Sequence, residues 1–168
     1  RAGRCAAVHP PELASAEDKT PATRRGAGAP CLDGARIDKH PALCEMEGLG
    51  FAEFGLAGLA QRGGVLGWPQ ARPPAAKYAL TYLFVQAEFG LCCPLSMTDS
   101  LTRTLGKFGD PALVARYLPA LTTQAFDDLY QGAMFMTEQG AGSDVAATTT
   151  RAEPDGDGYR LHGDKLFC

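Results

Sequence analysis

The chain has 168 residues, which is enough for one ordinary domain or one and a half small ones. Apolar residues make up 45% of the chain and charged residues 21%, a composition that predicts a globular fold. The net charge of −3 excludes a bulk electrostatic attraction to nucleic acid or to an anionic membrane. No apolar run approaches the ~20 residues that a transmembrane helix needs, so we expect no membrane span.

Six cysteines are present, and two of them, Cys92 and Cys93, are adjacent. No two are spaced as C-x-x-C, so we expect no zinc site and no other metal site. We interpret the cysteines as reduced thiols and the protein as cytoplasmic.

Residues 1–34 are rich in proline, alanine, glycine and charge, and they show no apolar period. We expect a disordered or loosely ordered N-terminal arm. A targeting peptide is the alternative, but Glu12, Glu17 and Asp18 are acidic, and transit peptides contain few acidic residues.

The first predicted helix covers residues 38–62, with Asp38 as its cap and Pro41 in its first turn. Four glycines within it leave open a break near Gly48 or Gly50. Residues 63–74 are rich in glycine and proline and predict a linker, whose Trp68 we interpret as pinning the loop to the core.

The apolar spacing of residues 75–91 predicts a second helix that stops before Pro94. A third helix is expected from a cap at Ser96 or Thr98 to about residue 108. Gly109 ends it, and Asp110 caps a short fourth helix that stops before Pro119. Together these helices predict an α-helical domain over residues 35–130.

From Gly132 the pattern changes from helical to extended. Residues 132–137 predict a buried strand, and residues 145–152, with three successive threonines, predict another. A hairpin turn is expected at 154–158, and further strands at 159–161 and from Leu166 onward. Helices followed by strands predict an α+β fold, with the β part over residues 131–168.

Residues 138–144, here called the glycine loop, connect the first two expected strands. Gly140 and Gly142 let a ligand approach the main chain, and the N–H groups of the glycine loop can form an anion-binding concavity between the hydroxyls of Thr137 and Ser143. The spacing matches neither the P-loop nor the dinucleotide fingerprint. From spacing alone, we favour a loop that only turns the chain.

The glycine loop is part of a longer motif that indicates a function. Residues 136–145, Met-Thr-Glu-Gln-Gly-Ala-Gly-Ser-Asp-Val, resemble the signature of the acyl-CoA dehydrogenase family. Residues 150–152, 158–161 and 163–168 resemble the same family's T-x-A and Y-x-L-x-G-x-K-x-(W/F) patterns. Residues 91–98 and 149–153 most resemble its alkylation-response, AidB-like branch, and a fainter match covers residues 36–42.

The resemblance implies an N-terminal helical domain, a middle β-barrel domain and a C-terminal helical bundle. This chain would be an N-terminal fragment with the first strands of an incomplete barrel and without the bundle. The implied function is FAD-dependent oxidation of an acyl-CoA thioester between Cα and Cβ by a homo-oligomer, a tetramer. The alternative is an AidB-like flavoprotein that binds DNA and has little dehydrogenase activity.

The resemblance also assigns roles to residues. Thr137 would donate a hydrogen bond to the flavin, and Ser143 would reach both FAD and the thioester. The residues implied to bind FAD are Met134, Phe135, Met136, Thr137, Gly142, Ser143, Phe167 and Cys168. The catalytic base is expected in the missing C-terminal part, and the carboxylates of the glycine loop, Glu138 and Asp144, are interpreted as structural.

Overall fold

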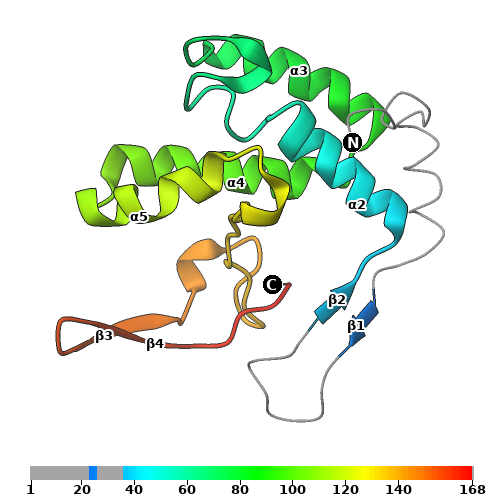
Figure 1. The fold of residues 1–168 in the computed structure, drawn as a ribbon. Helices are drawn as coiled ribbons and strands as arrows, with labels where there is room; N and C mark the ends of the chain where they lie inside the picture. Colours follow the sequence, from blue (N-terminus) through cyan, green and yellow to red (C-terminus); the bar gives the residue numbers. More distant parts are fainter. Residues whose placement is uncertain (1–22, 26–35, 168) are drawn as a thin grey trace. The chain divides into compact units, whose positions relative to one another are not determined.

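The computed structural model describes residues 23–25 and 36–167, with side chains from residue 39 onward, so most of the expected arm and Cys168 lie outside the described residues. The chain divides into two compact units, Arg1–Gly132 and Ala133–Cys168. Within the first unit, strand β1 (Thr23–Arg25) pairs antiparallel with β2 (Arg36–Asp38) (Figure 1). The sequence pattern predicted neither strand.

Helix α2 (Pro41–Glu47) begins at a cap that differs from the expected one. The Nδ1 atom of His40, not the carboxylate of Asp38, accepts a hydrogen bond from the Ala42 N–H at 3.1 Å. Because Pro41 occupies the first helical position, the capping position falls on the residue just before it. The helix changes at Gly48 into the π-helix η1 (Gly48–Glu53), so the break left open at this glycine exists and the predicted helix was too long.

Helices α3 (Pro74–Ala87) and α4 (Cys92–Phe108) are separated by fewer residues than the sequence suggested. Pro94 was expected to keep the two helices apart, but it lies in the first turn of α4. The N–H groups of a first turn have no partner within the helix, so proline is tolerated there. Thr98 is therefore not a cap; its hydroxyl donates to the Pro94 carbonyl at 2.8 Å, one turn back.

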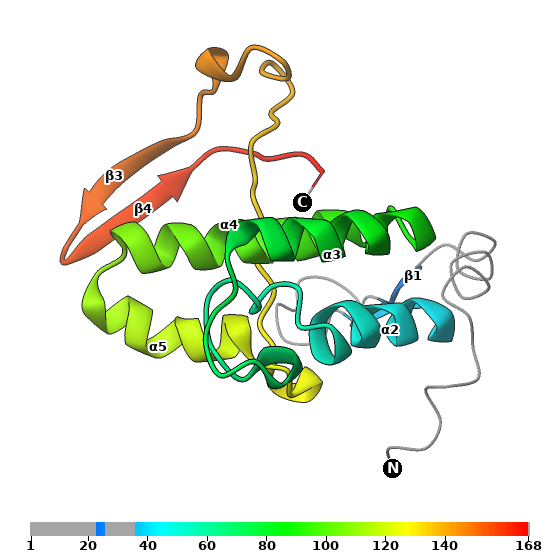
Figure 2. The ribbon, with the colours of Figure 1, turned by 90° about the horizontal axis from the view of Figure 1, so that it is seen from above.

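Helix α5 (Pro111–Thr122) starts as predicted and ends later than predicted. The Asp110 carboxylate accepts from the Ala112 N–H at 2.8 Å, which confirms the predicted cap, and Gly109 ends α4. The helix continues through Pro119, so the expected stop there was wrong. In both views α4 and α5 lie side by side, with the short 3-10 helix η3 (Phe126–Asp128) following them (Figures 1 and 2).

The core of this unit lies among α2, η1, α3 and α4. Met46 and Phe51 are among its most deeply buried large side chains. The other members of the cluster are Ala42, Leu56, Ala57, Phe84, Leu91 and Leu95. In the linker, the 3-10 turn η2 (Val65–Gly67) is anchored by Val65, which is buried, whereas Trp68 is 48% exposed beneath the Arg72 guanidinium. The interpretation that Trp68 pins the loop to the core was wrong.

The second unit contains one hairpin, β3 (Arg151–Asp155) with β4 (Gly158–His162), shown in orange and red in Figure 1. Gly156 adopts a φ of +61°, as the first position of a two-residue hairpin turn favours, so the predicted turn is confirmed.

The other expected strands are not formed. Residues 133–137 and 163–167 make no ladder, and the short 3-10 helix η4 (Val145–Ala147) replaces the start of the expected strand 145–152. A strand needs a neighbour that supplies paired hydrogen bonds, and within the described residues only β4 pairs with β3.

Apart from the short β1–β2 pair, the helices come before the strands, and this order confirms the α+β fold class. No helix in the described part of the chain is long and apolar enough to cross a membrane.

Candidate functional site

Glu138, the first residue of the glycine loop, is the centre of the polar network in the second unit. Its carboxylate accepts hydrogen bonds from the N–H of Thr149 at 2.7 Å and from the N–H of Thr150 at 3.0 Å. It also accepts from the hydroxyls of the same two threonines at 2.7 and 2.5 Å, and from the Lys165 ammonium at 2.8 Å. Although it carries a charge, the Glu138 residue is only 6% exposed.

These five donors stabilise the ionised carboxylate. The Lys165 ammonium first, and then the Thr150 and Thr149 donors, hold the pKa of Glu138 far below its ordinary range. A carboxylate with so low a pKa and with five donors around it is a poor proton acceptor. The geometry therefore agrees with the interpretation of Glu138 as a structural residue rather than a catalytic base.

A second set of contacts holds the segment just before the glycine loop. The Lys165 ammonium also donates to the Met136 carbonyl at 3.0 Å, and the Leu166 N–H donates to the Thr137 carbonyl at 2.9 Å. The backbone of residues 136–137 and the Glu138 carboxylate are thus bound by residues 165–166, which lie 27 or more positions further along the chain.

The glycine loop itself is tight at its start and open at its tip. Glu138 and Ala141 exchange two backbone hydrogen bonds, of 3.0 and 3.1 Å. A Cβ built on Gly140 or on Gly142 would meet no atom within 4 Å, so the main chain at the tip is free to approach a ligand. Ser143 is exposed beside it.

The residues that the resemblance assigned to FAD binding fall into two groups. Met134 (60%), Phe135 (55%), Met136 (38%) and Phe167 (92%) expose large apolar surfaces, although 132–137 was expected to be a buried strand. Thr137 is half-buried, and within residues 39–167 its hydroxyl makes no hydrogen bond. Gly142 and Ser143 lie together in the glycine loop, and Cys168 lies outside the described residues.

An exposed apolar run beside an open glycine loop fits an aromatic cofactor with an attached anionic group. The apolar side chains offer surface to a ring system, while the free N–H groups of the loop suit a phosphate. The sequence pattern did not indicate that Thr149, Thr150 and Lys165 are partners of Glu138. The run of threonines at residues 148–150 was interpreted as strand propensity, although hydroxyls and a lysine near a buried glutamate are also typical of a polar network.

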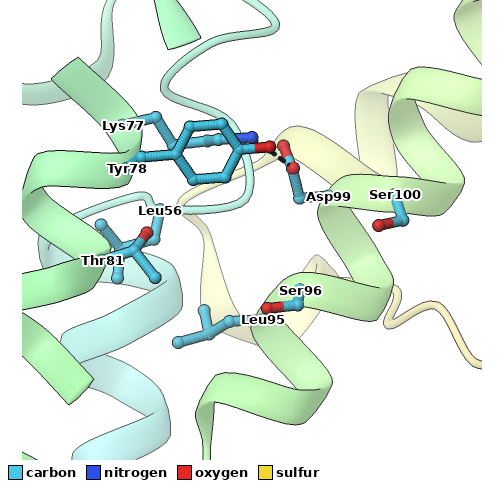
Figure 3. Close-up of a pocket in the computed structure, with 8 residues that line it drawn as sticks. All are labelled: Leu56, Lys77, Tyr78, Thr81, Leu95, Ser96, Asp99 and Ser100. Atoms are coloured by element: carbon cyan, nitrogen blue, oxygen red, sulfur yellow. Dashed lines mark hydrogen bonds and ion pairs between the residues drawn. The ribbon is translucent and has the colours of Figure 1, made fainter. Parts of the chain in front are cut away.

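The helical unit has a pocket of its own, between α3 and α4 (Figure 3). Its main feature is a buried ion pair between the Lys77 ammonium and the Asp99 carboxylate. The other oxygen of Asp99 accepts from the Gln61 amide at 3.0 Å, and the Lys77 ammonium also lies 4.2 Å from the centre of the Tyr78 ring. The pocket is small, about 80 Å³, and no group of three His, Cys, Asp or Glu able to hold a metal is found in the described part of the chain.

The helices, the hairpin and the glycine loop together are the features expected of the N-terminal part of an acyl-CoA dehydrogenase. The family described as "Adaptive response protein AidB N-terminal domain" matches residues 33–128, more than half of the chain. The chain therefore belongs to the AidB family, and the resemblance stated above is confirmed.

Relatives agree with this assignment. The chain is 34% identical to the putative acyl-CoA dehydrogenase AidB of Escherichia coli (strain K12), in a match that covers 98% of this chain and 29% of the relative. It is 36% identical to the short/branched chain specific acyl-CoA dehydrogenase of Bos taurus over 49% of this chain and 18% of the relative.

Two solved structures share the fold. The apo form of Bd2924 matches with a TM-score of 0.74 and 27% identity, over 92% of this chain and 31% of that one. Caenorhabditis elegans ACDH-11, solved in complex with C11-CoA, matches with a TM-score of 0.73 and 22% identity, over 92% and 26%. In each case the chain spans less than a third of the length of the relative.

Proposed function

We propose that the whole protein is an FAD-dependent oxidoreductase that removes hydrogen from Cα and Cβ of an acyl-CoA thioester. The observation that carries this proposal is the open glycine loop beside an exposed run of Met, Phe and Met, with the backbone between them held in place by hydrogen bonds. Relatives with the name acyl-CoA dehydrogenase support the same reaction class.

In this proposal, residues 134–136 and Phe167, with Cys168, provide the surface against which the flavin ring rests. When bound, FAD supplies the hydride acceptor, which no amino-acid side chain can provide. The hydroxyl of Thr137 donates a hydrogen bond to the ring at the place where negative charge accumulates as hydride arrives, and a fixed donor there favours the reaction.

The glycine loop serves the polar parts of the two ligands. Gly142 lets the main chain approach the cofactor without a side chain between them, and the exposed hydroxyl of Ser143 binds both FAD and the substrate's CoA arm. No residue of the described part is assigned as the catalytic base.

We further propose a helical domain over residues 35–130, a β domain from 131, a cytoplasmic location and a homotetramer.

The second candidate is an AidB-like flavoprotein that binds DNA, and the match to the AidB domain favours it. DNA binding requires a basic stripe or patch, whose electrostatic attraction supplies most of the affinity. This chain has a net charge of −3, and its arginines are scattered along the sequence. We therefore place the dehydrogenase first.

The first test mixes the purified whole protein, without oxygen, with short, branched and long acyl-CoAs. We expect at least one thioester to bleach the flavin absorption, because the flavin is reduced when the substrate is oxidised. Duplex DNA binding across a salt series is measured in parallel. Unbleached flavin together with DNA binding of steep salt dependence would establish the second candidate and overturn the first.

The second prediction concerns Thr137→Val, which keeps the shape of the side chain and removes its hydroxyl. We expect weaker FAD binding or slower flavin reduction, corresponding to about 1–3 kcal/mol, because a buried acceptor on the ring loses its donor. Flavin content after purification and the single-turnover rate of reduction measure the two effects. If both equal those of the wild type, Thr137 does not have the role given to it.

A further inference from the structure

The Glu138 carboxylate joins three stretches of chain that are distant in sequence. Glu138 is the first residue of the glycine loop, Thr149 and Thr150 follow that loop by several residues, and Lys165 comes after the hairpin. The buried carboxylate contrasts with the loop it begins, in which Gly142 and Ser143 are exposed. A rigid, buried anchor therefore lies at the base of a loop that is free to receive a ligand.

We propose that Glu138 is a positioning residue, whose carboxylate fixes the backbone of Thr137 and of the glycine loop in the conformation that binds the cofactor. This inference rests on the proposed flavin function and deepens it. Glu138 touches neither cofactor nor substrate; it acts through the groups that do.

The chemistry of the contacts explains why a carboxylate is needed at this position. Two backbone N–H groups and two hydroxyls converge on it from Thr149 and Thr150, and all four donate. An ionised carboxylate only accepts and has about four lone-pair sites, whereas a glutamine amide would direct two N–H donors at groups that are themselves donors. Only an acidic side chain satisfies this set of partners.

Lys165 is the remaining partner of Glu138, and its ammonium group is engaged within this network. Its ammonium donates both to the Glu138 carboxylate and to the Met136 carbonyl, so its charge is neutralised inside the network. We therefore assign Lys165 to the support of residues 136–138 and not to direct binding of a phosphate. The anion site of the glycine loop then depends on its own N–H groups and on Ser143, whose placement Glu138 controls.

The test compares Glu138→Gln with Glu153→Gln in the whole protein. Glu153 is an exposed carboxylate in β3 that pairs with Arg151 at 2.7 Å, so its substitution removes the same charge away from the glycine loop. The apoprotein is titrated with FAD, and the visible absorption spectrum is recorded at saturation. We expect Glu138→Gln to weaken FAD binding about tenfold and to change the spectrum, and Glu153→Gln to do neither.

The absorption spectrum of the bound flavin shows whether Glu138 positions the cofactor site or only stabilises the fold. A residue that only stabilised the fold would leave the flavin environment unchanged once FAD saturates the protein. Thr150→Val, which removes a single hydroxyl donor, is a milder variant that keeps the test valid if Glu138→Gln does not fold. We expect it to weaken FAD binding by about two- to threefold.

Exchanging the charges of Glu138 and Lys165 tests whether Glu138 acts as the acceptor for several donors or only as the partner of Lys165 in an ion pair. Glu138→Lys combined with Lys165→Glu restores opposite charges, but a lysine at position 138 cannot accept from the threonine N–H groups. We expect no rescue of FAD affinity. A rescued double variant, or wild-type affinity and spectrum in both Glu138→Gln and Thr150→Val, would overturn the proposal.

A separate measurement tests the anchoring role of Glu138 if the proposed flavin function itself is wrong. If the wild-type whole protein binds no FAD, that function is wrong, and the anchor is then judged by amide hydrogen exchange at Thr149, Thr150 and Leu166. Exchange at these three amides that is faster in Glu138→Gln than in Glu153→Gln supports the anchoring role. Equal exchange in the two variants overturns it.

Discussion

Lys77→Met is expected to lower the free energy of unfolding of the helical unit by about 3–5 kcal/mol. The Lys77 side chain is 5% exposed and the Asp99 side chain 13%, and the two are ion-paired between α3 and α4. Methionine fills a similar volume, so the loss comes from leaving the Asp99 carboxylate in a poorly solvated place without its cation. Urea unfolding, followed by the far-UV circular dichroism of the helices, measures the change.

The matched control is the double variant Lys77→Met/Asp99→Asn. Asparagine removes the unpaired charge and keeps a carbonyl oxygen that can accept from the Gln61 amide. We therefore expect the double variant to be more stable than Lys77→Met alone. For two independent sites, the second substitution would instead add its own loss of stability to that of the first. A single variant as stable as the wild type, or a double variant less stable than the single one, would show that the pair is not effectively buried.

Helix ends could be predicted where the signal lies within a few residues. The sequence Gly109-Asp110-Pro111 combines a helix end, a cap and a first-turn proline, and each group contacts only its near neighbours. Proline was a less reliable signal for a helix end, because its effect depends on where in the helix it lies. Pro94 lies in a first turn, where its missing N–H costs nothing, and Pro119 is kept within α5.

The sequence drew attention to the segment that contains the candidate site, but it did not indicate how the residues there are connected. The resemblance drew attention to Thr137, Gly142 and Ser143 through a continuous motif. The partners of Glu138 are 11, 12 and 27 residues away, so only the folded chain brings them together. Local propensity favours threonine in strands, yet Thr149 and Thr150 here satisfy a buried carboxylate, and this tertiary demand overrides propensity.

The same contrast applies to Gly132, which the sequence placed at the start of a buried strand. In the structure Gly132 is buried against α4, where its N–H donates to the Thr98 hydroxyl at 3.0 Å. A Cβ added there would lie 2.9 Å from the Met97 carbonyl oxygen and 2.9 Å from the Leu101 Cβ, closer than real Cβ atoms come, and 3.0 Å from the Thr98 Cα. The backbone of residues 131–133 can therefore follow its path only because residue 132 has no side chain.

Gly132→Ala should for this reason destabilise the helical unit by about 2–4 kcal/mol, since the chain must move away from α4 and weaken the bond to Thr98. Gly106→Ala is the control, because Gly106 is exposed within α4 and a Cβ there meets no atom within 4 Å. That substitution should raise stability by about 0.5–1 kcal/mol, as alanine favours the helix over glycine. Urea unfolding of both variants gives the comparison, and equal stabilities would mean that the close approach of Gly132 to α4 does not exist in solution.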